Sequence, residues 1–122
     1  MKITQVEEDI LHRGIIDDRR LYMYASNKSN FSFVGGIAGA MMSFVLIAVK
    51  GNTLHVCEAK LNNDIKNIIY RCPLSRIENF KFRPSSLFSV LSFTVGNDKF
   101  KFVNFQNGKK FIPVFKEAGL IK

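Results

Sequence analysis

The sequence predicts a mostly β fold that ends in one C-terminal α-helix. Two segments of alternating apolar and polar residues fold back on themselves at short turns, over 44–59 and 87–105. A third segment, over 110–118, carries its apolar residues at helical spacing. With 122 residues and a hydrophobic fraction of 47%, the chain has the material for one domain with one packed core.

The N-terminal segment is expected to hold a short helix followed by a less regular stretch. Thr4 and Glu7 have the spacing of a capping box, and Gly14 is of a residue type that often ends a helix. This pattern predicts a helix over about 5–13. Within 15–25 the apolar side chains alternate towards the end, which favours a strand there.

The clearest hairpin joins Phe44–Val49 to Thr53–Ala59 through the two-residue turn Gly51-Asn52. We expect Lys50 to lie opposite Thr53, which sets the pairing of every other residue along the hairpin. Both faces of the first strand are apolar. Since a strand of that kind is covered on both sides, we expect a second layer of protein outside the main core.

The second half of the chain alternates in the same way. Further strands are expected over 68–72, around 80–83, over 87–95 and over 99–105. We place Asn97-Asp98 at the tip of the last hairpin, with Gly96 opposite Lys99. In that register Phe93 faces Phe102 on the core side.

The C-terminal helix is predicted over about 110–118. Phe111 and Phe115 share its apolar face, and Gly119 is placed to end it. Pro113 fits this prediction if it lies in the first turn, where the N–H that proline lacks has no helical partner.

The stretch from Phe31 to Val49 has two interpretations. It holds no charged residue and is almost long enough to span a bilayer as a helix. Its glycines, Gly35, Gly36 and Gly39, instead favour a turn or short helix that leads into the strand at 44–49. We favour the second interpretation and expect no membrane anchor, while the first stays open at this point.

The formal net charge is +8, and a positive field of that size favours anionic partners. Four basic residues are predicted to lie together on the solvent face of the later strands: Lys81, Arg83, Lys99 and Lys101. This face is a candidate site for phosphate groups or an acidic peptide. Its alternative interpretation is the ordinary solvated side of an antiparallel sheet. Nucleic acid is disfavoured as a partner, because the aromatic side chains of these strands point the other way.

Catalytic and metal-binding chemistry is not expected. The two histidines, His12 and His55, have no neighbouring acid or nucleophile at a catalytic spacing. Cys57 and Cys72 form no Cys-x-x-Cys pair, so no zinc site is expected, and no cofactor motif is present. The thiols are expected to pack as small apolar groups. Together with a polar N-terminus that is no signal peptide, they indicate a cytoplasmic protein, either free or peripheral to a membrane.

The order of these elements resembles that of the bacterial pleckstrin-homology-like domains, which are related in shape to GRAM domains. The residues that carry the resemblance are Gly35-Gly36-Ile37-Ala38-Gly39-Ala40, Phe44–Val49, Leu54-His55-Val56, Pro73-Leu74-Ser75-Arg76-Ile77 and the closing hairpin and helix. The resemblance implies a partly open barrel of two near-orthogonal antiparallel sheets capped by one helix, with a binding or assembly role and no catalysis. On this interpretation 1–122 is one such domain, with an N-terminal extension over 1–30 and a core over 33–120.

Two functions are compatible with the sequence. The first is a protein-interaction or self-assembly module, in which Phe44, Leu46 and Ala48 form an apolar face that a second copy of the chain covers. The second is a peripheral binder of anionic membrane lipid that uses the basic sheet face.

Overall fold

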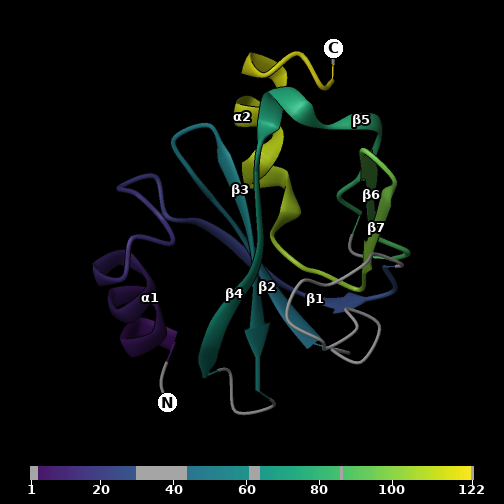
Figure 1. Cartoon of the computed structure of the whole chain (residues 1–122). Helices are drawn as coiled ribbons and strands as arrows, with labels where there is room; N and C mark the ends of the chain where they lie inside the picture. Colours follow the sequence, from purple (N-terminus) through teal and green to yellow (C-terminus); the bar gives the residue numbers. More distant parts are fainter. Residues whose placement is uncertain (1–2, 30–43, 61–63, 86, 122) are drawn as a thin grey trace.

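The computed structural model describes residues 3–29, 44–60, 64–85 and 87–121. The fold is mostly β with a short C-terminal helix, as predicted (Figure 1). Its helices and strands, in chain order, are α1 (Ile3–His12), β1 (Leu21–Asn27), β2 (Phe44–Lys50), β3 (Thr53–Ala59), β4 (Ile65–Pro73), β5 (Glu78–Arg83), β6 (Val90–Val95), β7 (Asp98–Val103) and α2 (Ile112–Glu117). Two short 3-10 turns complete them: η2 (Leu74–Arg76) and η3 (Gly108–Phe111).

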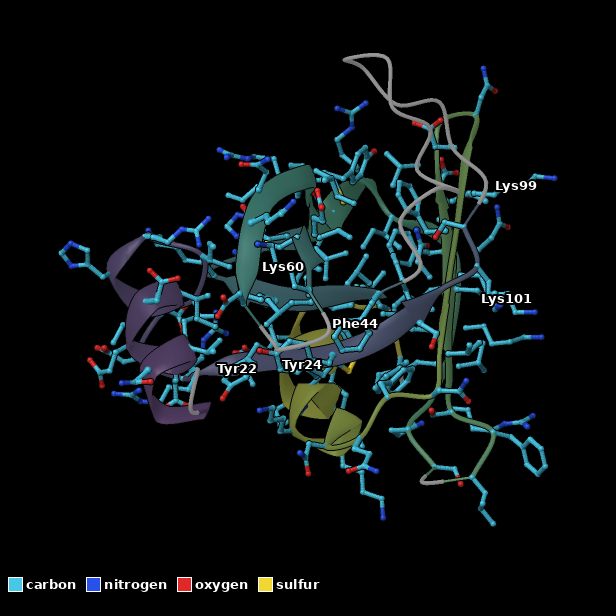
Figure 2. All side chains as sticks on the ribbon, turned by 90° about the horizontal axis from the view of Figure 1, so that it is seen from below. Tyr22, Tyr24, Phe44, Lys60, Lys99 and Lys101 are labelled. Carbon is cyan, nitrogen blue, oxygen red and sulfur yellow. The ribbon has the colours of Figure 1, made fainter. Side chains whose placement is uncertain are left out.

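The strands form one antiparallel sheet in the order β4-β3-β2-β1-β7-β6-β5, rather than the two separate sheets that we expected. The reason lies at the end of β1, where Ser26 pairs with Val103 and Asn27 pairs with Phe102 of β7. This junction of two residue pairs joins a four-stranded half to a three-stranded half. Figure 2 shows the halves running across one another, with β1 along one direction and the strand that carries Lys99 and Lys101 along the other.

The space between the two halves is filled by the main hydrophobic core, in which Phe93, Phe100 and Phe102 are at most 2% exposed. Tyr70 of β4 contacts Phe100 of β7, with ring centroids 4.5 Å apart. Phe115 of α2 meets the rings of Phe80 and Phe82 edge-on, each at 5.0 Å. Aromatic contacts therefore link the edge strand β4 to β7 and the edge strand β5 to α2, while β4 and β5 share no strand ladder among the described residues.

The predicted register of the first hairpin is confirmed pair by pair, from Lys50 opposite Thr53 to Val45 opposite Glu58. The register predicted for the last hairpin is wrong by two residues, because Phe93 pairs with Phe100 and not with Phe102. The turn is Gly96-Asn97, in which Gly96 has a φ of 61° that suits the first central position of a two-residue hairpin turn. Since side chains alternate with a period of two, a shift of two residues leaves each one on its predicted face.

The N-terminal helix is confirmed, although it begins at Ile3 and so includes Thr4, which is therefore not a cap ahead of the helix. Its C-terminal end is a Schellman motif around Gly14, whose φ is 76°. The Gly14 amide bonds to the Leu11 carbonyl at 3.2 Å, and the Ile15 amide to the Ile10 carbonyl at 2.9 Å. Gly119 ends α2 in the same way, with a φ of 77°.

Three predicted boundaries are wrong. The core does not begin near residue 33, because β1 lies inside the sheet between β2 and β7. Strand β4 begins at Ile65, ahead of the strand expected over 68–72. Residues 87–89 precede β6 instead of belonging to it.

The second layer over β2 is α1 together with the segment that follows it. Val6 and Ile10 of the helix, with Ile15 and Ile16, form a second hydrophobic cluster against the sheet. Figures 1 and 2 both place α1 on the side of β2–β4 that lies away from β6 and β7. Both faces of β2 are therefore covered within the chain, and its central five residues are buried.

The two cysteines lie in different layers. Cys57 belongs to the cluster under α1, and Cys72 belongs to the main core between the two halves of the sheet. Both are free thiols, as their expected apolar packing requires. Burial raises the pKa of Cys57 to about 12 and the pKa of Cys72 to about 11.

The apolar stretch at 31–49 does not form one continuous helix, because Phe44–Val49 belong to strand β2. The rest of the stretch, 31–43, lies outside the described residues, as do Gly35, Gly36 and Gly39. In the part of the chain that the structure describes, no helix has the length and apolarity needed to cross a membrane.

An ion pair in the segment that connects α1 to β1 holds the turn of the first hairpin. Its members are Asp17 and Arg19. Asp17 accepts hydrogen bonds from Nε and Nη2 of the Arg19 side chain, from the Arg19 amide and, at 2.8 Å, from the Gly51 amide. Arg19 donates to the Gly51 carbonyl at 2.7 Å. These donors, with the Arg19 side chain first among them, hold the pKa of Asp17 well below its ordinary value of 3.8.

Asp17→Asn is expected to remove a pH dependence of stability. Because the folded-state pKa is depressed, the ion pair stabilises the fold fully above the unfolded pKa of 3.8 and loses its effect as the pH falls below that value. For a partly exposed pair we expect a contribution of about 1 kcal/mol at neutral pH. Urea unfolding between about pH 6 and pH 3 measures it. An equal effect from Asp18→Asn, the exposed neighbouring carboxylate, would contradict this assignment.

Gly108→Ala is expected to destabilise the fold by about 1–3 kcal/mol, the usual cost of overpacking a core. A Cβ atom at Gly108 would lie 2.7 Å from Cε1 of Phe105, a residue that is 2% exposed, and 3.3 Å from Cβ of Pro84. Urea unfolding of the variant checks this, with Lys109→Ala at the exposed neighbouring position as the control. If the two substitutions cost the same, the close contact does not matter.

Candidate binding surface

The predicted basic residues gather on the outer face of β5, β6 and β7. Lys81 pairs with Ser92, and Ser92 pairs with Lys101, so these three side chains form one row across the strands. Lys99 and Arg83 lie in the rows on either side, opposite Thr94 and Val90. Successive rows on one face are about 7 Å apart. The four charges therefore share one face of the sheet.

The structure adds a fifth basic residue, Lys28, which lies beyond the strand expected within 15–25. The Lys28 amide donates to the Lys101 carbonyl at 2.8 Å, which continues the pairing of β1 with β7 by one residue. Ser29 then bonds to both backbone groups of Lys101 through its hydroxyl. Lys28 therefore lies opposite Lys101 and extends the central row to Lys81, Ser92, Lys101 and Lys28.

We call this surface the basic face and define it as Lys28, Lys81, Arg83, Lys99 and Lys101. All five residues are exposed, and none forms an ion pair with another described residue. Glu78 is the acidic residue that shares the outer face, in the same row as Lys99. Figure 2 shows Lys99 and Lys101 pointing away from the body of the protein. The basic face can therefore accept several anionic groups at once without breaking an ion pair between described residues.

A pair of exposed apolar residues lies just beyond the basic face, in the connection between β5 and β6. Leu87 is 71% exposed and Phe88 is 81% exposed, and they are the large apolar side chains that stand out most in the described part of the chain. We call this pair the apolar tip. It follows the row of Arg83 and Val90, so the nearest charge of the basic face is Arg83.

The apolar tip is held at its base by Ser89, which is 2% exposed. The Ser89 hydroxyl donates to the Phe105 carbonyl at 3.1 Å and accepts from the Phe105 amide at 2.9 Å. Phe88 itself has a φ of 59°, an unusual backbone conformation for a bulky residue. Because Ser89 turns inwards here, the chain departs from strand geometry and the Phe88 side chain stays in solvent. The alternation that predicted one strand over 87–95 did not indicate this departure.

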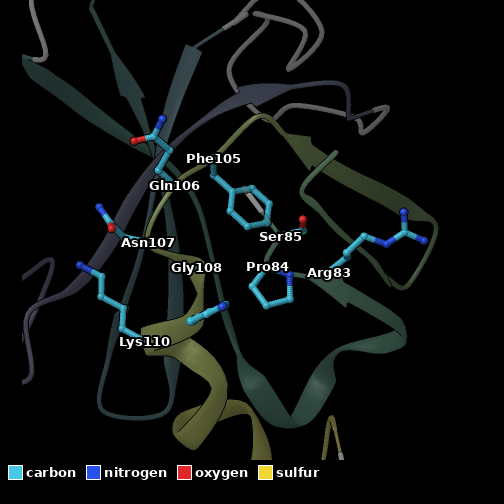
Figure 3. Close-up of a pocket in the computed structure, with 9 residues that line it drawn as sticks. Arg83, Pro84, Ser85, Phe105, Gln106, Asn107, Gly108 and Lys110 are labelled. Atoms are coloured by element: carbon cyan, nitrogen blue, oxygen red, sulfur yellow. The ribbon is translucent and has the colours of Figure 1, made fainter. Parts of the chain in front are cut away.

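A hollow of about 950 Å³ lies between the end of β5, at Arg83–Ser85, and the segment over 105–110 that leads into α2. Figure 3 shows Phe105, Pro84 and Gly108 along it, with Arg83 and Lys110 at its two ends. Lys110 also lies over the Tyr22 ring at 4.5 Å, and burial lowers the pKa of Lys110. The hollow thus continues the positive surface around the end of the sheet.

The predicted protein interface is not open in this structure. Leu46 and Ala48 are fully buried under α1, and only Phe44 is partly exposed, where its ring stacks on Tyr24 at 5.5 Å. The hypothesis that a second copy of the chain covers these residues is wrong for Leu46 and Ala48, because the N-terminal helix already does so. The pattern showed that β2 needed a second cover but could not show that the cover lay upstream in the same chain.

The histidines and cysteines do not assemble into a reactive group. Within the described ranges, no three side chains of the metal-binding types lie close enough together to hold an ion. His12 is exposed near the end of α1, whereas His55 is buried on β3 and bonds to the Ile15 carbonyl.

Ser89→Ala is expected to lower the stability by about 1–3 kcal/mol, because it leaves both backbone groups of Phe105 without their partner in a buried place. Chemical unfolding measures this. Ser92→Ala, on the solvent side of the same strand, is the matched control and should change stability by less than about 0.5 kcal/mol. A similar loss in both variants would show that the Ser89 hydroxyl does not anchor the loop.

Comparison with known proteins does not assign the chain to a family, since no family model and no curated protein matches it.

Proposed function

We propose that this chain is a non-catalytic binding module of pleckstrin-homology-like type that docks on an anionic membrane surface. The observation that carries the proposal is the apolar tip, Leu87 and Phe88, at the edge of a face with five basic side chains that form no ion pair with any described residue. A large exposed apolar pair next to positive charge suits a surface that is apolar inside and anionic outside.

The two parts of the surface supply different contributions. Transfer of a Leu or Phe side chain out of water is favourable by about 1.5–3 kcal/mol when it is complete. Each Lys or Arg near an anionic leaflet adds about 1 kcal/mol, and salt screens this attraction. Neither contribution alone gives stable docking, but a combination of the two kinds does.

The arrangement of the strands supports the pleckstrin-homology-like interpretation. A four-stranded and a three-stranded half enclose one core, and α2 packs its Phe115 against β5 at the open side. The proposal also specifies a location at the cytoplasmic face of a membrane, which carries the anionic lipids that attract a basic surface.

Self-assembly or protein interaction is the second candidate function, and the apolar tip is the surface that would serve it. Leu46 and Ala48, which the sequence predicts as part of a protein interface, are buried within the chain. Leu87 and Phe88 could instead be covered by a protein partner, and the following experiment separates the two outcomes.

Docking is tested by sedimentation with vesicles of phosphatidylcholine, with and without phosphatidylserine. We expect binding only to the anionic vesicles, and weaker binding as salt is added. Lys81→Gln with Lys101→Gln should weaken it roughly 30-fold, since two charges contribute about 2 kcal/mol. Leu87→Ser with Phe88→Ser should weaken it at least tenfold and leave the salt dependence unchanged.

The control for charge is the pair Lys60→Gln with Lys116→Gln, two exposed lysines outside the basic face. If this pair weakens docking as much as the Lys81 and Lys101 pair, attraction is general and the basic face has no special role. If the tip variant docks normally but changes the sedimentation of the protein without vesicles, the apolar tip is a protein interface and the membrane proposal is wrong.

A further inference from the structure

A second positive site lies on the opposite side of the sheet, beside α1. A hollow of about 640 Å³ is bounded by the end of the helix at Arg13 and Gly14, the first hairpin turn, and the outer face of β3 and β4. It shares no residue with the basic face or the apolar tip. Figures 1 and 2 place α1 and β7 on opposite sides of β2–β4, so the two sites face different ways.

His55 lies in the wall of this hollow and is only 6% exposed. Its Nδ1 lies 3.0 Å from the Ile15 carbonyl oxygen. Since a carbonyl oxygen only accepts hydrogen bonds, Nδ1 carries the proton in the neutral ring and Nε2 is the basic nitrogen. Nε2 has no hydrogen-bond partner among the described residues. The imidazole is thus fixed in one tautomer, its ring lines a positively charged hollow, and Nε2 is unbonded in the described part of the chain.

The cations around His55 come from three neighbouring elements. Arg71 of β4 is its direct cross-strand partner, and Lys50 lies one row nearer the turn on the same face. Neither forms an ion pair among the described residues. Arg13, at the end of α1, also lines the hollow but already bonds to Asp9 and to the Ile65 carbonyl.

The one carboxylate in the lining, Asp17, does not neutralise these charges. Its oxygens are occupied by the Arg19 side chain and by the Gly51 amide. Burial is the main cause that lowers the pKa of His55, Arg71 and Lys50 lower it further, and the bond to Ile15 opposes them. Among the described residues, two cations without an ion pair and a neutral imidazole therefore share a hollow that holds no free counter-ion.

We propose that this hollow binds a phosphate- or sulfate-class dianion, held by Lys50 and Arg71 and completed by His55 through Nε2. The imidazole can donate from Nε2 only after it takes up a proton, because Nδ1–H is already committed to Ile15. A bound dianion stabilises the imidazolium and raises its pKa. Binding of an anion that has no proton of its own is therefore coupled to uptake of one proton.

Inorganic sulfate is the first probe, since its charge does not change near neutral pH. The pKa of each histidine is followed by NMR in sulfate and in chloride at equal ionic strength. We expect sulfate to raise the pKa of His55 and to leave the exposed His12 unchanged. The affinity for sulfate should rise by up to about tenfold for each pH unit lowered, between the pKa values of the free and bound forms.

Arg71→Gln tests the site without touching the buried ring, because Arg71 is exposed. It should weaken sulfate binding at least tenfold and remove the sulfate-induced shift at His55. Lys99→Gln makes the same charge change on the opposite side and should leave both unchanged. A His55 that responds no more than His12, or equal losses in the two variants, would overturn the proposal.

Two further probes present the same phosphate monoester in different forms. Glycerol phosphate supplies it in solution, and vesicles with phosphatidic acid supply it as a lipid headgroup. A shift at His55 with glycerol phosphate alone assigns the site to a soluble ligand, and a shift with both assigns it to a headgroup as well. If neither phosphate shifts the His55 pKa, the proposal fails, while docking through the basic face is unaffected.

Discussion

The structure depends on a constraint in strand β2, which is apolar on both faces. Such a strand is stable only between two layers, so one face requires the barrel core and the other requires a cover. Helix α1 supplies that cover with Val6 and Ile10, and the bonds from Arg13 to β4 hold the helix in place. The N-terminal segment is therefore part of the fold, and the hollow around His55 exists because the helix ends where it does.

The junction between β1 and β7 determines what the protein presents to solvent. Only two residue pairs of the strands link the halves there, and the three-stranded half crosses the other at this point. The turn to a new direction places Phe93 and Phe100 inside and the lysines of β7 outside. One end of the same junction, at Ser29 and Lys101, brings Lys28 to the basic face.

Local patterns predicted the strands and the side-chain faces well, because both follow from alternation and from short turns. The register of the first hairpin followed from Gly51-Asn52, and the same dipeptide, Gly96-Asn97, also forms the second turn, where the prediction used Asn97-Asp98 instead. What could not be predicted rests on contacts between distant segments. The cover over Leu46 and the pairing of Lys28 with Lys101 are of this kind, and no local pattern encodes either.

The separation of the two cysteines by the sheet gives each layer its own chemical reporter. Cys57 is sealed under α1, and Cys72 is sealed inside the barrel. Only the thiolate form of cysteine reacts readily with alkylating reagents, and the raised pKa values keep both thiols protonated in the folded chain. The rate at which Cys57 is alkylated therefore reports how fast the helix separates from the sheet. The rate at which Cys72 is alkylated reports how fast the two halves of the sheet separate.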